Sequence, residues 1–188
     1  KLKGPRPIVT PNVRQAIVDL RVGSILNCGG HAYPPATWHD LISSIQTAAA
    51  DKASGIPVLY GIDAIHGANY TSGAVLGPQQ IGLSATWDTS LVRKLAENVA
   101  REVRGSGIPW NFSPVLDVAL DPRWPRFWET FGESPKLASD MGVAMVKGYQ
   151  EGPAPIAATL KHYVGYSRPL SGKDRTPAWI PERQLREI

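Results

Sequence analysis

Polar side chains that can bind hydroxyl groups follow short apolar runs of this sequence. Asp63 ends one run, and Lys161 and His162 directly follow another. Arg126 lies in a loop that is rich in tryptophan and phenylalanine. A carboxylate accepts hydrogen bonds, ammonium and guanidinium groups donate them, and an imidazole can do either. These four residues can together hydrogen-bond the hydroxyls of one pyranose ring, so the residue types indicate a sugar-binding site.

Each of these residues also has a purely structural interpretation. Asp63 can cap its own loop, and position alone does not separate that role from sugar binding. Arg126 can pair with Glu129 or Glu133 on the surface, an interpretation that the segment by itself favours. Lys161 can pair with an acidic residue such as Asp117 at the floor of the fold. A lysine buried after an apolar strand without a partner would cost roughly several kcal/mol, so Lys161 is expected to have one.

The sequence gives no pattern for a metal or a nucleotide. His31, His39 and His66 lack metal-ligand spacing with other His, Cys, Asp or Glu residues. His66 follows Asp63 in the same loop and is expected to support the site without touching a ligand. Gly29-Gly30 and the glycines near position 106 do not form a phosphate-binding loop. We therefore expect no cofactor and no metal.

The candidate residues follow predicted strands that alternate with predicted helices. Apolar runs predict strands at 22–27, 56–62, 108–117 and 156–160, with a further short strand at 81–84. Helical periodicity and capping residues predict helices at 13–22, 37–53, 88–103 and 134–149, and another opening at 181. The run 56–62 has the continuous apolar character of a strand that is buried on both faces.

This alternation predicts parallel βαβ units, in either a barrel or an open doubly wound sheet. In both architectures ligands bind where the strands end, at the C-terminal edge of the sheet. Asp63, Asp117 and His162 all lie at such strand ends. The expected organisation and the expected chemistry therefore agree.

The bulk composition is that of an ordinary globular protein with one core. The chain has 188 residues, of which 43% are hydrophobic and 19% charged. Its net charge of +4 comes from scattered residues, so nucleic-acid binding is not indicated. No run reaches the roughly 18 apolar residues of a membrane span. A single cysteine, Cys28, excludes an internal disulfide and is expected to be apolar filler. A complete TIM barrel typically needs about 250 residues, more than are present.

Four motifs in order closely resemble the N-terminal domain of glycoside hydrolase family 3. They are Gly61-Ile62-Asp63-Ala64-Ile65-His66-Gly67, Trp110 to Val118, Asp121 to Glu133, and Lys161-His162-Tyr163. The likeness runs from about Gly23 to the C-terminus. It implies a partial TIM-type (β/α)8 barrel over 1–188, with 1–22 as an irregular lead-in.

The resemblance also implies an activity and site residues. Family members are mostly exo-acting, retaining β-glucosidases, so the implied partner is a β-glucoside or oligosaccharide, with no nucleic acid and no membrane. By motif, Asp63, Arg126, Lys161 and His162 bind the nonreducing-end glucose. Three further residues are implied to hold these side chains in place without touching the sugar: His66, Asp117 and Glu129. A secreted or periplasmic location is favoured by the same resemblance.

The catalytic carboxyl groups of the family are expected beyond Ile188. The family nucleophile is an Asp in a Ser-Asp-Trp type motif, which this sequence lacks, and the acid/base is usually a Glu from a following domain. This chain alone is therefore expected to be inactive. Tyr166 stands in the loop where the family's N-acetylglucosaminidase branch has a catalytic histidine, which favours the glucosidase branch. The alternatives are an inactive carbohydrate-binding fragment or pseudogene product, and an unrelated α/β enzyme.

Overall fold

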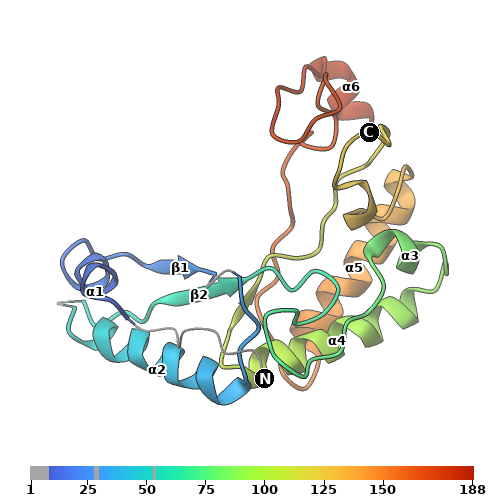
Figure 1. The fold of residues 1–188 in the computed structure, drawn as a ribbon. Helices are drawn as coiled ribbons and strands as arrows, with labels where there is room; N and C mark the ends of the chain where they lie inside the picture. Colours follow the sequence, from blue (N-terminus) through green and yellow to red (C-terminus); the bar gives the residue numbers. More distant parts are fainter. Residues whose placement is uncertain (1–8, 28–29, 53) are drawn as a thin grey trace.

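The structure is a three-stranded parallel sheet with helices packed against one of its faces (Figure 1). It is a computed structural model that describes residues 9–27, 30–52 and 54–188. The expectation for Cys28 lies outside these residues. The elements in order are α1 (Pro11–Val18), β1 (Ser24–Leu26), α2 (Pro35–Ala50), β2 (Leu59–Ile62), α3 (Gln80–Ser84), α4 (Thr89–Gly105), β3 (Trp110–Asn111), the 3-10 helix η1 (Phe127–Glu129), α5 (Pro135–Glu151) and α6 (Glu182–Glu187).

The strands pair in the order β1-β2-β3, all parallel. Ile62 of β2 is in register with Asn111 of β3. The run predicted as a fourth strand pairs beside β3 through two isolated bridges, Trp110 with Ala157 and Val115 with Lys161. The predicted parallel α/β class is confirmed, although the strands are shorter than the apolar runs.

Local signals place the long helices. Ser134 caps α5 by accepting a hydrogen bond from the backbone N–H of Leu137. Asp88 caps α4 in the same way. The start of the helix predicted at 37–53 is two residues too late, because α2 already begins at Pro35, whose fixed φ suits a first helical position. Helix α1 lies within the segment expected to be an irregular lead-in.

In the part of the chain that the structure describes, the hydrophobic core packs against one face of the sheet, and exposed leucines lie on the other. Tyr60 and Ile62 point into the core, while Leu59 is 55% exposed and Leu26 of β1 is 67% exposed. Alternate residues of a strand point to opposite faces. The prediction that the run 56–62 is buried on both faces is therefore wrong for the face that carries Leu59.

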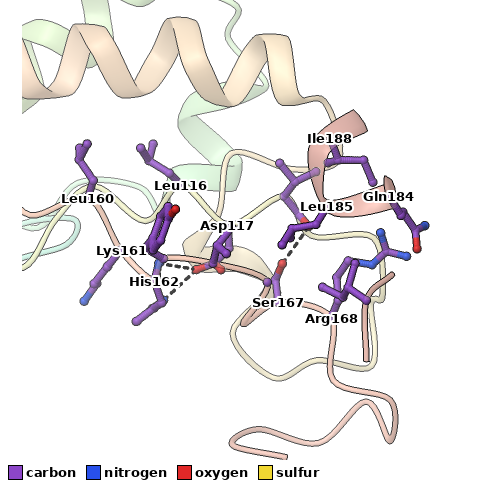
Figure 2. Close-up of a pocket in the computed structure, with 15 residues that line it drawn as sticks. Leu116, Asp117, Leu160, Lys161, His162, Ser167, Arg168, Gln184, Leu185 and Ile188 are labelled. Carbon is purple, nitrogen blue, oxygen red and sulfur yellow. Dashed lines mark hydrogen bonds and ion pairs between the residues drawn. The ribbon is translucent and has the colours of Figure 1, made fainter. Parts of the chain in front are cut away.

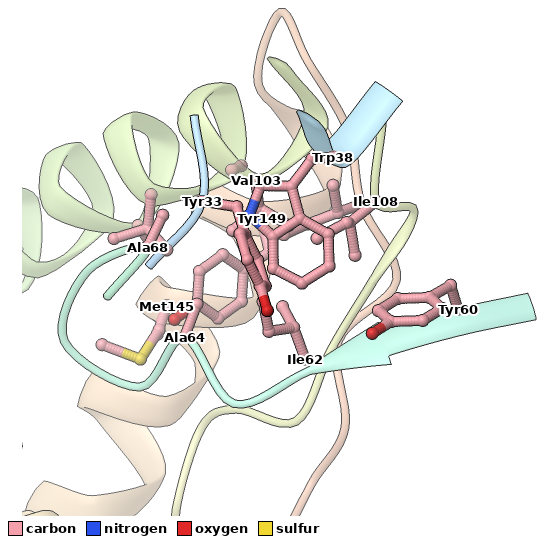
Figure 3. Packing of buried hydrophobic residues seen from close by; sticks show 14 of the residues in the cluster. Tyr33, Trp38, Tyr60, Ile62, Ala64, Ala68, Val103, Ile108, Met145 and Tyr149 are labelled. Carbon is pink, nitrogen blue, oxygen red and sulfur yellow. The ribbon is translucent and has the colours of Figure 1, made fainter. Parts of the chain in front are cut away.

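Aromatic side chains dominate the centre of this core (Figure 3). The ring of Trp38 meets the rings of Tyr33 and Tyr60 edge-on, at centroid distances of 5.6 and 5.8 Å. The indole N–H of Trp38 donates to the carbonyl of Tyr70 at 2.8 Å, so its one polar group is satisfied. Tyr149 of α5 is completely buried and its hydroxyl lies 2.9 Å from that of Ser113. Burial raises the pKa of Tyr149.

Three amide side chains, called the amide clamps below, complete the hydrogen bonding where the short strands stop. Each clamp donates to a backbone carbonyl and accepts from a backbone N–H: Gln46 does so on Val58, Gln80 on Val115, and Asn111 on Ala64. Buried backbone groups need such partners. The clamps let the sheet end without leaving peptide groups unpaired.

The strand predicted at 81–84 is wrong, because these residues form helix α3. Gln80 at its start is fully buried, with its amide held by Val115. This contact joins residues 35 positions apart, so the local apolar pattern could not show it. Tertiary structure overrides local propensity here.

Candidate functional site

Asp63 and Lys161 form an ion pair at the C-terminal edge of the sheet. The ammonium Nζ of Lys161 lies 2.7 Å from Oδ1 of Asp63, although the residues are 98 positions apart. Asp63 follows β2 directly, and Lys161 bridges to Val115 beside β3. The side chain of Lys161 is 10% exposed and that of Asp63 36% exposed. The lysine therefore has an acidic partner as expected, but the partner is Asp63 and not Asp117.

Asp117 instead holds His162. One carboxylate oxygen of Asp117, Oδ2, accepts hydrogen bonds from the backbone N–H of His162 at 3.1 Å and from ring Nδ1 at 2.8 Å. A carboxylate accepts, so this contact assigns the Nδ1–H tautomer when the ring is neutral and directs Nε2 away from Asp117. Asp117 is buried, which fits a supporting position. These two pairs are called the strand-end half of the site.

A cavity of about 290 Å³ lies beside the strand-end half (Figure 2). Its lining combines Asp117, Lys161 and His162 with apolar side chains that include Leu116 and Leu160. Figure 2 shows both leucines on one side of the segment and Lys161 extending to the other. The charged groups thus stand at the border of an apolar hollow.

Arg126 and Glu129 form a second ion pair in the loop after β3. Two nitrogens of Arg126 donate to the two carboxylate oxygens of Glu129, at 2.9 and 2.6 Å. Such a fork is more directional than a single contact. The pair is the predicted structural alternative for Arg126, but it does not lie on the open surface, since the side chains are 22% and 17% exposed. The hydrogen bonds to Glu129 raise the pKa of Arg126.

Tyr166 joins the two ion-paired regions. Its ring lies 4.6 Å from that of His162, edge to face, and the guanidinium of Arg126 lies 5.6 Å from the ring centre. Its hydroxyl donates to Asp174 at 2.6 Å. Arg126, Glu129, Tyr166 and Asp174 are called the loop half. From the sequence, Tyr166 was used only to distinguish branches of the family and Asp174 was not singled out, so neither was assigned to the site.

The four residues expected to touch a sugar are therefore connected by contacts. Asp63 meets Lys161, which precedes His162, whose ring meets Tyr166, which in turn lies against Arg126. His66 stands in the loop after Asp63, and its Nδ1 donates to the carbonyl of Gly77 at 2.9 Å. The backbone N–H of Gly77 also donates a hydrogen bond to the carbonyl of His66, so two hydrogen bonds hold the ends of this loop together.

Two absences hold within the residues that the structure describes. No group of three or more His, Cys, Asp or Glu side chains is arranged to hold a metal ion in residues 9–27, 30–52 and 54–188. No helix in these same ranges is long and apolar enough to cross a membrane.

Comparison with known proteins gives consistent matches. Residues 4–188 match the family model for the N-terminal domain of glycosyl hydrolase family 3. A lysosomal beta glucosidase of Dictyostelium discoideum is 45% identical over an alignment of 183 positions, and the match covers 88% of this chain and 22% of the relative. A β-glucosidase involved in saponin metabolism, from intestinal bacteria, has a TM-score of 0.80 and 38% identity over 92% of this chain and 23% of that one. A β-glucosidase of Listeria innocua in complex with glucose has a TM-score of 0.72 and 30% identity, covering 87% and 22%.

The parallel β/α architecture and these matches define a glycosidase domain of the partial TIM-barrel type. The chain belongs to glycosyl hydrolase family 3. The family recognised from the sequence is thus confirmed, as is the fold class. The chain spans about a fifth of the length of the relatives it matches, 22% for the Dictyostelium protein.

Proposed function

We propose that this chain forms the part of a retaining, exo-acting β-glucosidase that holds the nonreducing-end glucose. Asp63, Arg126, Lys161 and His162 are the proposed sugar contacts. The observation that carries the proposal is the Asp63–Lys161 pair, which brings an acceptor and a donor from distant strands to 2.7 Å. The complex of the similar Listeria β-glucosidase with glucose supports the choice of ligand.

The chemistry of these residues suits a pyranose. Lys161 has three N–H donors and gives one to Asp63, so two can reach hydroxyl groups. Asp63 keeps a second carboxylate oxygen as an acceptor. Nε2 of His162 is turned away from Asp117, and Arg126 keeps N–H groups that the fork to Glu129 does not use. Acceptors and donors of fixed direction thus alternate along the site.

The catalytic carboxyl groups belong, in this proposal, to parts of the enzyme outside this sequence. A retaining glycosidase needs a nucleophile and an acid/base about 5 to 5.5 Å apart. Of the carboxylates of the site, Asp63, Asp117 and Glu129 are each engaged by a basic side chain, and Asp174 accepts from Tyr166 and Trp124. We assign them to binding and support, and we expect this chain alone not to hydrolyse an aryl β-glucoside.

The binding role is tested by titrating the chain with D-glucose, with chemical shifts of the 15N-labelled protein as the readout. Asp63→Asn and Arg126→Lys are each expected to weaken binding at least roughly tenfold, because a charge-assisted hydrogen bond is worth about 1.5–3 kcal/mol. The matched controls Asp140→Asn and Arg186→Lys alter exposed pairs with Lys136 and Glu182 and should leave binding unchanged.

Two outcomes would contradict the proposal. The first is the absence of glucose binding to the folded wild-type chain. The second is equal loss of binding in the site variants and in their controls. Binding without hydrolysis is expected for this chain, and hydrolysis of an aryl β-glucoside would overturn the assignment of catalysis to other parts of the enzyme.

The proposal places the enzyme outside the cytosol, either secreted or in a periplasm, with a glycoside as its partner and no nucleic acid or membrane. The name of a similar protein, the periplasmic beta-glucosidase of Salmonella typhimurium, supports this location. Fractionation of the source cells with an antibody against this chain tests it, and a purely cytosolic signal would contradict it.

A further inference from the structure

We propose that Asp174 is a positioning residue, which fixes Tyr166 and Trp124 behind the proposed sugar contacts Arg126 and His162. Its effect on sugar binding rests on the proposed function, whereas its effect on geometry does not. Asp174 lies in the segment between Lys161, which forms the last β-bridge, and α6. It is outside the motifs that the sequence analysis singled out.

One carboxylate oxygen of Asp174 accepts hydrogen bonds from two aromatic side chains. Oδ1 accepts from the hydroxyl of Tyr166 at 2.6 Å and from the indole Nε1 of Trp124 at 3.2 Å. Trp124 is fully buried, and its ring meets that of Tyr166 edge-on at 5.4 Å. The two rings and the carboxylate therefore form a closed unit in which each member limits the movement of the others.

This unit reaches both halves of the site through Tyr166. The hydroxyl oxygen of a tyrosine lies on the axis of its second side-chain torsion, so the hydrogen bond to Asp174 fixes the direction of the ring axis. The edge-on contact with Trp124, which Asp174 also holds, limits rotation of the ring about that axis. The faces and edges of that ring contact the imidazole of His162 and the guanidinium of Arg126. Displacement of the ring would remove the support of both groups together.

The electrostatics agree with a carboxylate that stays ionised. The hydrogen bond from Tyr166 is the largest cause that lowers the pKa of Asp174, and smaller contributions come from Trp124 and the positive charges of Arg126 and Arg175. Arg175 is 83% exposed and 3.7 Å away, so it adds little. The hydrogen bonds from Tyr166 and Trp124 are therefore the main contacts that keep Asp174 ionised.

The test compares Asp174→Ala with Asp174→Asn in the 15N-labelled chain, first without ligand. The amide oxygen of Asn can accept from both aromatic donors, but Ala cannot. We expect Asp174→Ala to shift the Nε1–H signal of Trp124 and the Nε–H signal of Arg126, and Asp174→Asn to leave both near their original positions. Trp124→Phe and Arg126→Lys assign the two signals.

The glucose titration then measures the consequence for binding. We expect Asp174→Ala to weaken binding roughly fivefold to tenfold, the equivalent of about one lost hydrogen bond, and Asp174→Asn to restore most of it. Asp140→Ala, which breaks the exposed pair with Lys136, is the matched control and should change neither signal nor binding. Tyr166→Phe, which keeps the ring but removes its hydroxyl, replaces Asp174→Ala should that variant fail to fold.

The outcomes separate this proposal from the proposed function. An unchanged Arg126 signal in folded Asp174→Ala would overturn the positioning role, whatever the chain binds. Failure of Asp174→Asn to restore the signals would also overturn it, since hydrogen-bond geometry would then not be the cause. If the wild-type chain binds no glucose, the proposed function fails, while the ligand-free spectra still decide the role of Asp174.

Discussion

The two halves of the candidate site are held in different ways. The strand-end half joins residues far apart in sequence, with Asp63 and Lys161 separated by 98 positions, so it exists only when the sheet has formed. The ion pair of the loop half joins Arg126 to Glu129 within one turn of chain, and the guanidinium of Arg126 lies over the ring of Tyr166. The strand-end half therefore depends on global stability, whereas in the loop half the ion pair is local and its contact with Tyr166 depends on tertiary folding.

The largest expected effect comes from disturbing the scaffold beneath the strand-end half. Helices α4 and α5 cross closely at Gly148, where an added Cβ would lie 2.5 Å from the carbonyl oxygen of Arg93 and 2.6 Å from Cβ of Ala96. Backbone cannot move aside cheaply, so Gly148→Ala should lower the free energy of unfolding by about 3 kcal/mol. Urea unfolding followed by circular dichroism measures this.

Gly105→Ala is the control for this substitution. Gly105 ends α4, and an added Cβ there meets nothing within 4 Å. Replacing a helical glycine by alanine should leave stability unchanged or raise it by up to about 1 kcal/mol. If both variants unfold at the same urea concentration, the close crossing of α4 and α5 at Gly148 does not contribute to the stability on which the strand-end half depends.

An intermediate effect is expected from removing one partner of the strand-end pair. Lys161→Met leaves Asp63 without its cation in a partly buried position, which should cost about 1–2 kcal/mol of unfolding free energy, below the cost in a dry interior because Asp63 is 36% exposed. Lys136→Met breaks an exposed pair with Asp140 and should cost at most about 0.5 kcal/mol. Equal losses in thermal or urea unfolding would show that burial of the strand-end pair has no energetic consequence.

The smallest expected effect is the response of the loop half to acid. The pKa of Asp174 in the folded chain lies below its ordinary value of 3.8. Its contribution is therefore fully present above that value and is lost as the pH falls through the lowered pKa. The Trp124 Nε1–H signal should follow this titration, with its midpoint below pH 3.8. Asp174→Asn should abolish that titration, and its persistence in the variant would assign it to another carboxylate.

The same contrast explains what could be predicted from the sequence. The caps Asp88 and Ser134 act on N–H groups two or three residues away, so local pattern located α4 and α5. The contact between Arg126 and Glu129 was foreseen as an alternative for the same reason. The partner of Lys161 depends on strand register, which the pattern does not contain, and the sequence suggested Asp117 where the structure has Asp63.

Two further residues show why the remainder was not predictable. Gln80 begins a helix where apolar residues suggested a strand, because its amide is bound by Val115 from another part of the chain. Asp174 lies in a polar stretch that differs little from other loops, and only folding brings it to Trp124, 50 positions away. Both roles come from tertiary contacts between side chains and distant segments.

The amide clamps have a consequence for the chemical ageing of this protein. Each clamp at Gln46, Gln80 and Asn111 needs a donor and an acceptor on the same side chain. Deamidation would replace the donor with a carboxylate oxygen and set it against a backbone carbonyl, which repels it. Mass spectrometry of folded and unfolded material after storage should find the converted side chains enriched in the unfolded fraction.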